Sequence, residues 1–202
     1  TVEADISRGL PSYEMVGLPD AAVKESKERV RSAIKNSALE FPSHKITVNL
    51  APAYVKKEGS SLDLPVAISL LLASGALEAK VEGIIFLGEL ALNGELRPVS
   101  GVLPSIISAR DKGFQKFILP YGNQKEASFI HGVEIYAAKT LREVVDHLSG
   151  VKPMESVPAA AFCEKSAQEE SAYDLAFVKG QSIAKRALEV AVAGGHNILF
   201  VG

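Results

Sequence analysis

The sequence has 202 residues, enough for one large domain or for one domain and part of a second. Hydrophobic residues make up 47% and the formal net charge is −2, so a packed core is expected and no overall basic field points to nucleic acid. The single cysteine, Cys163, excludes a disulfide framework and a paired-cysteine zinc site, which favours a reducing, cytoplasmic location.

Metal binding and membrane insertion find no support in the sequence either. The four histidines are far apart and lack the spacing of metal ligands: His44, His131, His147 and His196. The longest apolar run, residues 64–77, is too short to cross a bilayer. The chain begins in strand-like sequence and ends directly after an apolar run, and we interpret both ends as cuts through structure.

Helix-like and strand-like segments alternate in the first half of the chain, which is typical of an α/β fold. Apolar residues at helical spacing predict a helix over 21–37, capped by Asp20. Residues 45–50 alternate and are rich in β-branched side chains, which predicts a strand. After a buried helix that ends near Gly75, residues 84–99 are expected to form a hairpin. Its turn would be Asn93-Gly94, with positive φ at both residues.

The second half continues the alternation and then lapses. We expect, in order, a helix over 103–112, a strand over 116–120, a short helix after Asn123, a strand over 133–138 and a helix over 141–148 capped by Thr140. Prolines, alanines and polar residues over 151–172 indicate a linker. A helix over 180–193 and a buried strand over 196–202 follow.

The stretch KKEGSSLDLPVA, residues 56–67, places two serines and an aspartate directly before an apolar helix. Ser60 and Asp63 have the spacing of a capping box, and Gly59 gives the turn its backbone freedom. A serine in such a turn also occurs as a nucleophile, but it then needs a base that takes its proton. Helix capping is therefore the favoured interpretation of Ser60 and Ser61.

The helix over 21–37 concentrates positive charge that is suited to binding phosphates, from Lys24, Lys27, Arg29, Arg31 and Lys35. Two acidic residues of the same helix, Glu25 and Glu28, lie at pairing distance from Arg29 and Arg31. A solvated, salt-bridged face is the favoured interpretation. Because the sequence has no tryptophan and only scattered tyrosines, we expect this part of the chain alone to bind DNA weakly.

Three blocks in fixed order resemble the magnesium-chelatase-like ATPase family of the competence protein ComM and the YifB proteins. They read VGLPDAAVKESKERVRSAIKNS, ITVNLAPAYVKKEGSSLDLPVAISLL and FLGELALNGELRPVSGVLPSIISARDKGF. A fourth block, YDLAFVKGQSIAKRALEVAVAGGHNILFVG, is similar to the beginning of the family's AAA+ module. The resemblance covers nearly the whole chain, the linker excepted.

The resemblance implies a mixed α/β (α+β) fold in two parts. Residues 1–150 are expected to form a domain similar to the proteolytic domain of Lon protease and to part of ribosomal protein S5, with a first strand missing before Thr1. Residues 151–172 are the expected linker. Residues 173–202 are then only the first helix and strand of a P-loop AAA+ ATPase domain.

The Lon-like resemblance also assigns positions to a serine and its base. In Lon the nucleophilic serine pairs with a lysine from the helix after the hairpin, and Ser61 occupies the position of that serine. Leu103, followed by Pro104, occupies the position of the lysine. Leucine neither accepts a proton nor donates a hydrogen bond, so no catalytic residue is expected and the domain is expected to be non-proteolytic.

An apolar strand that ends on Gly202 resembles the approach to a P-loop, whose lysine and Mg²⁺-binding hydroxyl would follow. By resemblance, residues 177–181 lie against adenine, so the candidate nucleotide-binding residues are Val178, Gly180, Gln181 and Gly202. An ordinary start of a helix is an equal alternative for the first three. ATP and Mg²⁺ are expected cofactors of the full-length protein, and residues 1–202 alone are expected to hydrolyse no ATP.

The function implied by the resemblance is that of a homo-hexameric ATPase ring acting on single-stranded or branched DNA, in branch migration during natural transformation and recombination. The assembled ATPase ring is expected to hold the DNA, and the Lon-like domain is expected to contribute subunit packing and a few phosphate contacts. An ATP-dependent chelatase or protein-remodelling subunit is the alternative. A serine-dependent peptidase is a third hypothesis, which Leu103 argues against.

Overall fold

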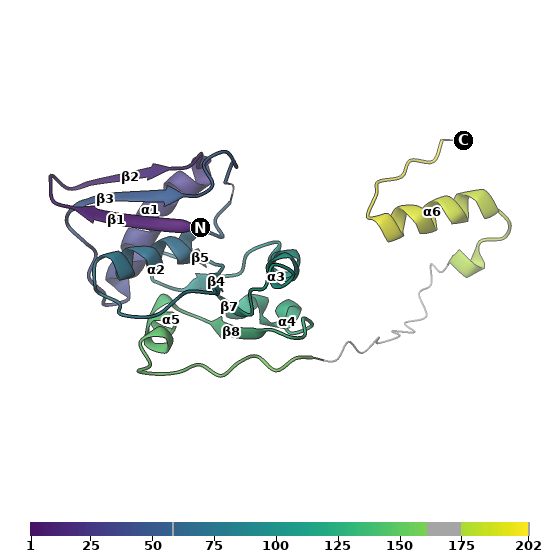
Figure 1. Ribbon diagram of the computed structural model, residues 1–202. Helices are drawn as coiled ribbons and strands as arrows, with labels where there is room; N and C mark the ends of the chain where they lie inside the picture. Colours follow the sequence, from purple (N-terminus) through teal and green to yellow (C-terminus); the bar gives the residue numbers. More distant parts are fainter. Residues whose placement is uncertain (58, 161–174, 202) are drawn as a thin grey trace. The chain divides into compact units, whose positions relative to one another are not determined.

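A computed structural model describes residues 1–57, 59–160 and 175–201 of the chain (Figure 1). The chain divides into two compact units, Thr1–Phe162 and Cys163–Gly202. Parallel and antiparallel strands are combined with helices, so the mixed α/β fold expected from the sequence is confirmed.

The first unit begins with a three-stranded sheet in the order β1-β3-β2. Strand β1 (Val2–Ser7) runs antiparallel to β3 (Lys45–Leu50), whereas β2 (Ser12–Val16) runs parallel to it. Parallel neighbours need a crossover, which helix α1 (Ala21–Asn36) supplies. The predicted cap is confirmed, because the Val23 amide donates to the Asp20 carboxylate over 2.8 Å.

Helices α1 and α2 (Asp63–Ala73) pack against this sheet (Figure 1). Helix α1 turns one apolar face inward, as its spacing predicts, and α2 is buried on most of its surface. The large side chains of this core are fully buried and include Ile34, Ile46, Leu50, Leu64, Ile68 and Leu71.

A second sheet of three parallel strands has the order β4-β7-β8. Its strands are β4 (Ile84–Phe86), β7 (Lys116–Pro120) and β8 (Glu134–Ala138). Helix α3 (Val102–Arg110) connects the first pair. The short helices η1 (Tyr121–Asn123) and α4 (Gln124–Ala127) connect the second. A separate core lies here, built on Val102, Ile106, Phe117, Leu119 and Ile135.

Asn93-Gly94 joins two short antiparallel strands, β5 (Glu89–Leu90) and β6 (Leu96–Arg97), so a hairpin at this place is confirmed. The hairpin is shorter than expected, because residues 84–86 pair with β7 instead of continuing it. Positive φ at both turn residues was also wrong: only Gly94 has it, at +87°. The Gly94 amide donates to Ala91 over 2.9 Å, which gives a tight turn with a single left-handed residue.

Helix α5 (Leu141–Leu148) starts at the predicted cap, since the Glu143 amide donates to the Thr140 hydroxyl over 3.2 Å. Residues 151–160 then form neither helix nor strand, but they are fastened to the first unit. The Val157 amide donates to the Ile135 carbonyl of β8 over 2.7 Å. The first part of the expected linker is therefore held against the domain, and residues 161–172 lie outside the described part.

The second unit contains a 3₁₀ turn, η2 (Leu175–Phe177), and helix α6 (Ser182–Gly194). The predicted strand over 196–202 is not found among the described residues 196–201, which are exposed. A strand needs a hydrogen-bonding neighbour, and the described residues of this unit provide no strand edge. No helix in the described part of the chain is long and apolar enough to span a membrane.

Candidate functional site

The turn before α2 carries the serine that sequence places at the nucleophile's position. Neither serine caps the helix as expected: Leu62 is the capping residue, and no side chain bonds the first turn. The Ser60 hydroxyl instead donates to the carboxylate of Glu89 on β5. The capping box is therefore a wrong prediction, because its two side chains find other partners. Among the described residues, no hydrogen bond is recorded for the Ser61 hydroxyl.

Asp63, the other half of the expected capping box, forms a buried ion pair with Arg29 of α1. Arg29 Nε and Nη2 donate to the two carboxylate oxygens over 2.7 and 3.0 Å, a bidentate geometry. The Leu90 amide of β5 donates to the same carboxylate over 3.1 Å. The pair thus ties α1, the start of α2 and β5 together directly behind the Ser61 turn.

The pKa values of the two members of this pair are shifted by different causes. Burial raises the pKa of Asp63 above the ordinary value of an aspartate, and the hydrogen bonds from Arg29 and Leu90 oppose that shift. The hydrogen bond to Asp63 raises the pKa of the Arg29 guanidinium, since it favours the charged form. Sequence reasoning missed this pair. The signal was a carboxylate at the edge of an otherwise apolar helix, where ionic partners are common.

The position that the Lon resemblance assigns to the base is occupied by Leu103. Leu103 lies in the first turn of α3, which follows Gly101, and its side chain is 36% exposed. Lys57, which precedes the Ser61 turn, donates its ammonium group to the carbonyl oxygens of Gly17 and Pro52. The recorded hydrogen bonds of the Lys57 ammonium group are therefore to the main chain.

Helix α1 keeps only part of the expected internal neutralisation. Glu25 acts electrostatically on Arg29, but in the described part of the chain neither Glu25 nor Glu28 forms an ion pair, and Arg29 is turned inward to Asp63. Two other cations lie over aromatic rings: the Lys27 ammonium is 5.5 Å from the Tyr13 ring centre, and the Arg31 guanidinium is 5.8 Å from that of Phe41.

The candidate nucleotide-binding residues lie where the chain enters α6. Val178 and Gln181 line a mostly apolar hollow of about 720 Å³ between α6 and residues 198–201. Gly180 lies between them in the chain with φ of +68°, and Gln181 follows with φ of +54°. A left-handed glutamine is strained, which is common at binding sites. Gly202 lies outside the described residues.

Comparison with known proteins gives two family matches. The family described as "Subunit ChlI of Mg-chelatase" matches residues 2–123, more than half of the chain. The family described as "Magnesium chelatase, subunit ChlI" matches residues 174–202, which include α6.

Three curated relatives place these matches in context. The competence protein ComM of Haemophilus influenzae is 43% identical over 207 residues, which cover all of this chain and 40% of that protein. The uncharacterized protein YifB of Escherichia coli is 45% identical over 203 residues, with 100% and 39% coverage. Lon protease 2 of Bacillus subtilis is 29% identical over 157 residues, covering 74% of this chain and 28% of that protease.

The chain spans about two fifths of the length of ComM and YifB. The family resemblance and the Lon similarity expected from the sequence are confirmed. The chain belongs to the family of the magnesium-chelatase subunit ChlI.

Proposed function

We propose that this chain is the N-terminal part of a cytoplasmic AAA+ ATPase that acts on DNA as a homo-hexameric ring, and that its Lon-like domain is non-proteolytic. The observation that carries the proposal is the family match on both sides of the linker, in a chain with Leu103 at the position that the Lon resemblance assigns to the base. By "full-length protein" we mean a protein of the length of ComM or YifB that contains this chain.

ATP is the proposed cofactor, with Mg²⁺ as its companion ion. The hollow beside α6 is lined by apolar side chains together with Gln181 and Lys185, which suits a nucleotide base better than a triphosphate. Val178 and Gln181 are the proposed contacts to the base. ATP hydrolysis supplies the free energy for movement on DNA.

The proposed task is branch migration during uptake and recombination of DNA. It is supported by the name of the relative ComM, which is described as a competence protein. The match to ComM covers the whole of this chain. The inert Ser61 position is compatible with a Lon-like domain that serves as a scaffold in such a ring, since a scaffold needs the fold without the chemistry.

The test is hydrolysis of ATP by the full-length protein with and without DNA. We expect phosphate release that single-stranded or branched DNA increases, and conversion of a labelled four-way junction that depends on ATP. Hydrolysis that no DNA changes, together with an unaltered junction, would contradict the proposal. A labelled peptide library should remain intact throughout, because the peptidase base is absent.

A second candidate is an ATP-dependent chelatase or protein-remodelling subunit, because both family descriptions carry the name of magnesium chelatase. The two candidates differ in what stimulates ATP hydrolysis. A chelatase or remodelling subunit responds to its protein partner and not to DNA. Stimulation by DNA therefore separates them in one assay.

A further inference from the structure

A groove beside α1 is lined by cations and by no carboxylate. Its volume is about 300 Å³, and the charged residues of its lining are Lys27, Arg31 and Lys35, accompanied by His44. No aspartate or glutamate is among the lining residues, although the whole chain has a net charge of −2. The groove is thus a local positive site in a slightly acidic protein.

The three cations form a row along one face of the helix. They are spaced four residues apart, so successive side chains lie on the same side of α1. At a rise of about 1.5 Å per residue, the row extends over about 12 Å. A single phosphate cannot contact all three, whereas a chain of phosphates can.

Aromatic rings hold two of these cations without neutralising them. Lys27 lies over Tyr13 and Arg31 over Phe41, at 5.5 and 5.8 Å from the ring centres. No ion pair of Lys27, Arg31 or Lys35 is recorded in the described part of the chain. A cation over a ring keeps its full charge and its outward hydrogen-bond donors, so Lys27 and Arg31 are held in place before a ligand arrives.

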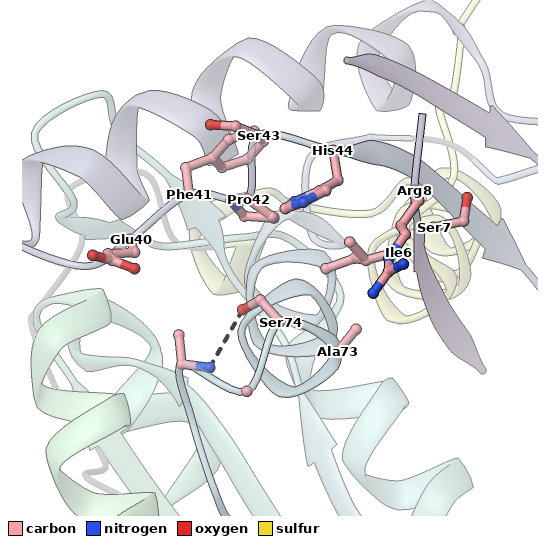
Figure 2. A pocket seen from close by; sticks show the side chains of 12 residues that line it. Ile6, Ser7, Arg8, Glu40, Phe41, Pro42, Ser43, His44, Ala73 and Ser74 are labelled. Atoms are coloured by element: carbon pink, nitrogen blue, oxygen red, sulfur yellow. Dashed lines mark hydrogen bonds between the residues drawn. The ribbon is translucent and has the colours of Figure 1, made fainter. Parts of the chain in front are cut away.

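A neighbouring cavity adds one cation and one carboxylate. Its volume is about 790 Å³, and it shares the segment Phe41–His44 and adds Glu40 and Arg8, the residue after β1. Figure 2 shows Arg8 and His44 projecting into this cavity, with the carboxylate of Glu40 at the other end of the view. The hydroxyls of Ser12 and Ser43 add uncharged donors to the groove.

We propose that this groove binds the phosphate backbone of single-stranded DNA, an inference that rests on the proposed function and locates one DNA contact of the ring. A row of cations in a groove without a lining carboxylate suits a ligand with repeated negative charge. A single strand can follow a narrow groove along α1, whereas a duplex would touch only the rims. Because Lys27 and Arg31 already cover the rings, phosphates and not stacked bases are the recognised groups.

The test measures how affinity for DNA depends on salt in the full-length protein. Fluorescence anisotropy with labelled oligo(dT) gives the slope of log affinity against log salt. This slope is negative, and each phosphate contact on a single strand makes it steeper by about 0.7. The groove variant is Lys27→Gln/Arg31→Gln/Lys35→Gln. The matched control, Lys80→Gln/Lys112→Gln/Lys125→Gln, removes the same charge from exposed lysines without recorded ion pairs in the described part of the chain.

We expect the slope of the groove variant to be less steep by about 2 for each groove engaged. When salt rises from 50 to 200 mM, its affinity should therefore fall by a factor roughly twenty times smaller than that of the wild-type protein. The control should leave the slope unchanged. A charge-preserving variant, Lys27→Arg/Arg31→Lys/Lys35→Arg, should retain the wild-type slope. A duplex of equal length should bind less tightly than the single strand.

Because Lys27 and Arg31 also pack on rings, ATP hydrolysis without DNA and thermal unfolding are measured for every variant. If the triple variant does not fold, Lys35→Gln, which has no recorded ring contact among the described residues, still tests the site and should make the slope less steep by about 0.7.

An unchanged slope in the groove variant, an equal change in the control, or tighter binding of the duplex overturns the groove assignment. The proposed function survives those results as long as DNA still stimulates ATP hydrolysis. Absence of any binding by the wild-type protein would overturn both.

Discussion

The Asp63 carboxylate is removed from water, and only Arg29 balances its charge within the described part of the chain. Replacing Arg29 by methionine keeps much of the side-chain volume but leaves the carboxylate buried and unpaired. We expect Arg29→Met to lower the free energy of unfolding by about 3–5 kcal/mol. Urea unfolding at neutral pH, followed by circular dichroism, measures the change.

The matched double variant Arg29→Met/Asp63→Leu removes both charges. It should recover part of the lost stability, because the remaining defect is the Leu90 amide, whose missing acceptor costs about 1–3 kcal/mol. A double variant as unstable as the sum of the two single variants would show that the two side chains do not stabilise each other.

Ser61 and Ser60 differ in what their hydroxyls contact, which makes them a pair for comparison. We expect Ser61→Ala to change the free energy of unfolding by less than about 0.5 kcal/mol, since no hydrogen bond of its hydroxyl is recorded in the described part. Ser60→Ala should cost about 1 kcal/mol, because it removes the hydrogen bond to Glu89.

A serine-reactive phosphonate probe tests the chemistry of the same turn. The wild-type protein should remain unlabelled, since Leu103 offers no base. Labelling that disappears in Ser61→Ala would reverse this conclusion.

Among the secondary-structure elements, the β5–β6 hairpin depends most closely on its neighbour. Its turn lies against the end of α1: the Asn36 side chain donates to the Leu92 carbonyl over 2.6 Å. A Cβ on Gly94 would lie 2.5 Å from Ser37 Oγ, in addition to the strain at φ of +87°. Gly94→Ala should therefore destabilise the protein through both effects.

Gly113→Ala is the control for that experiment. Its φ of +93° carries the same strain, but a Cβ there meets no atom within 4 Å. We expect about 1–2 kcal/mol from strain at either position, and a smaller additional cost at Gly94, where the Ser37 hydroxyl must rotate away from the new Cβ. Equal melting temperatures of the two variants would show that the contact between the hairpin turn and Ser37 adds no cost to the strain.

Sequence predicted the elements whose signals are local. Asp20 and Thr140 cap their helices as expected because capping depends on a residue and the three that follow it. The pairing of β4 was missed, because its partner β7 lies about 30 residues further along the chain. The strand over 196–202 was predicted from apolar content, which cannot show whether a neighbouring strand is present.

The candidate site likewise has features that the sequence predicts and features that it does not. The assignment of Leu103 to the position of the base rests on residue type and on the family's order of motifs, and it stays a prediction. Arg29 and Asp63 lie 34 residues apart in the chain, and their ion pair joins α1 to α2. Helical spacing instead suggested that Arg29 pairs with an acidic residue of α1. The cationic groove was missed for the same reason, since its aromatic residues come from β2 and from the segment before β3.

For the whole molecule, three cations per groove make one copy of the chain a weak ligand for DNA. In the proposed ring, several grooves would face the same strand, and each contact after the first would be intramolecular and take place at a high effective concentration. We therefore expect the affinity of the full-length protein for oligo(dT) to rise more than tenfold when the oligonucleotide is lengthened from about 10 to about 40 nucleotides.

The Lys27→Gln/Arg31→Gln/Lys35→Gln variant should show a much smaller gain, because its extra contacts lack charge, and the control variant should show the full gain. Equal affinity of the wild-type protein at both lengths would mean that a single copy engages the strand alone, and a full gain in the groove variant would assign the length dependence to the ATPase part of the ring.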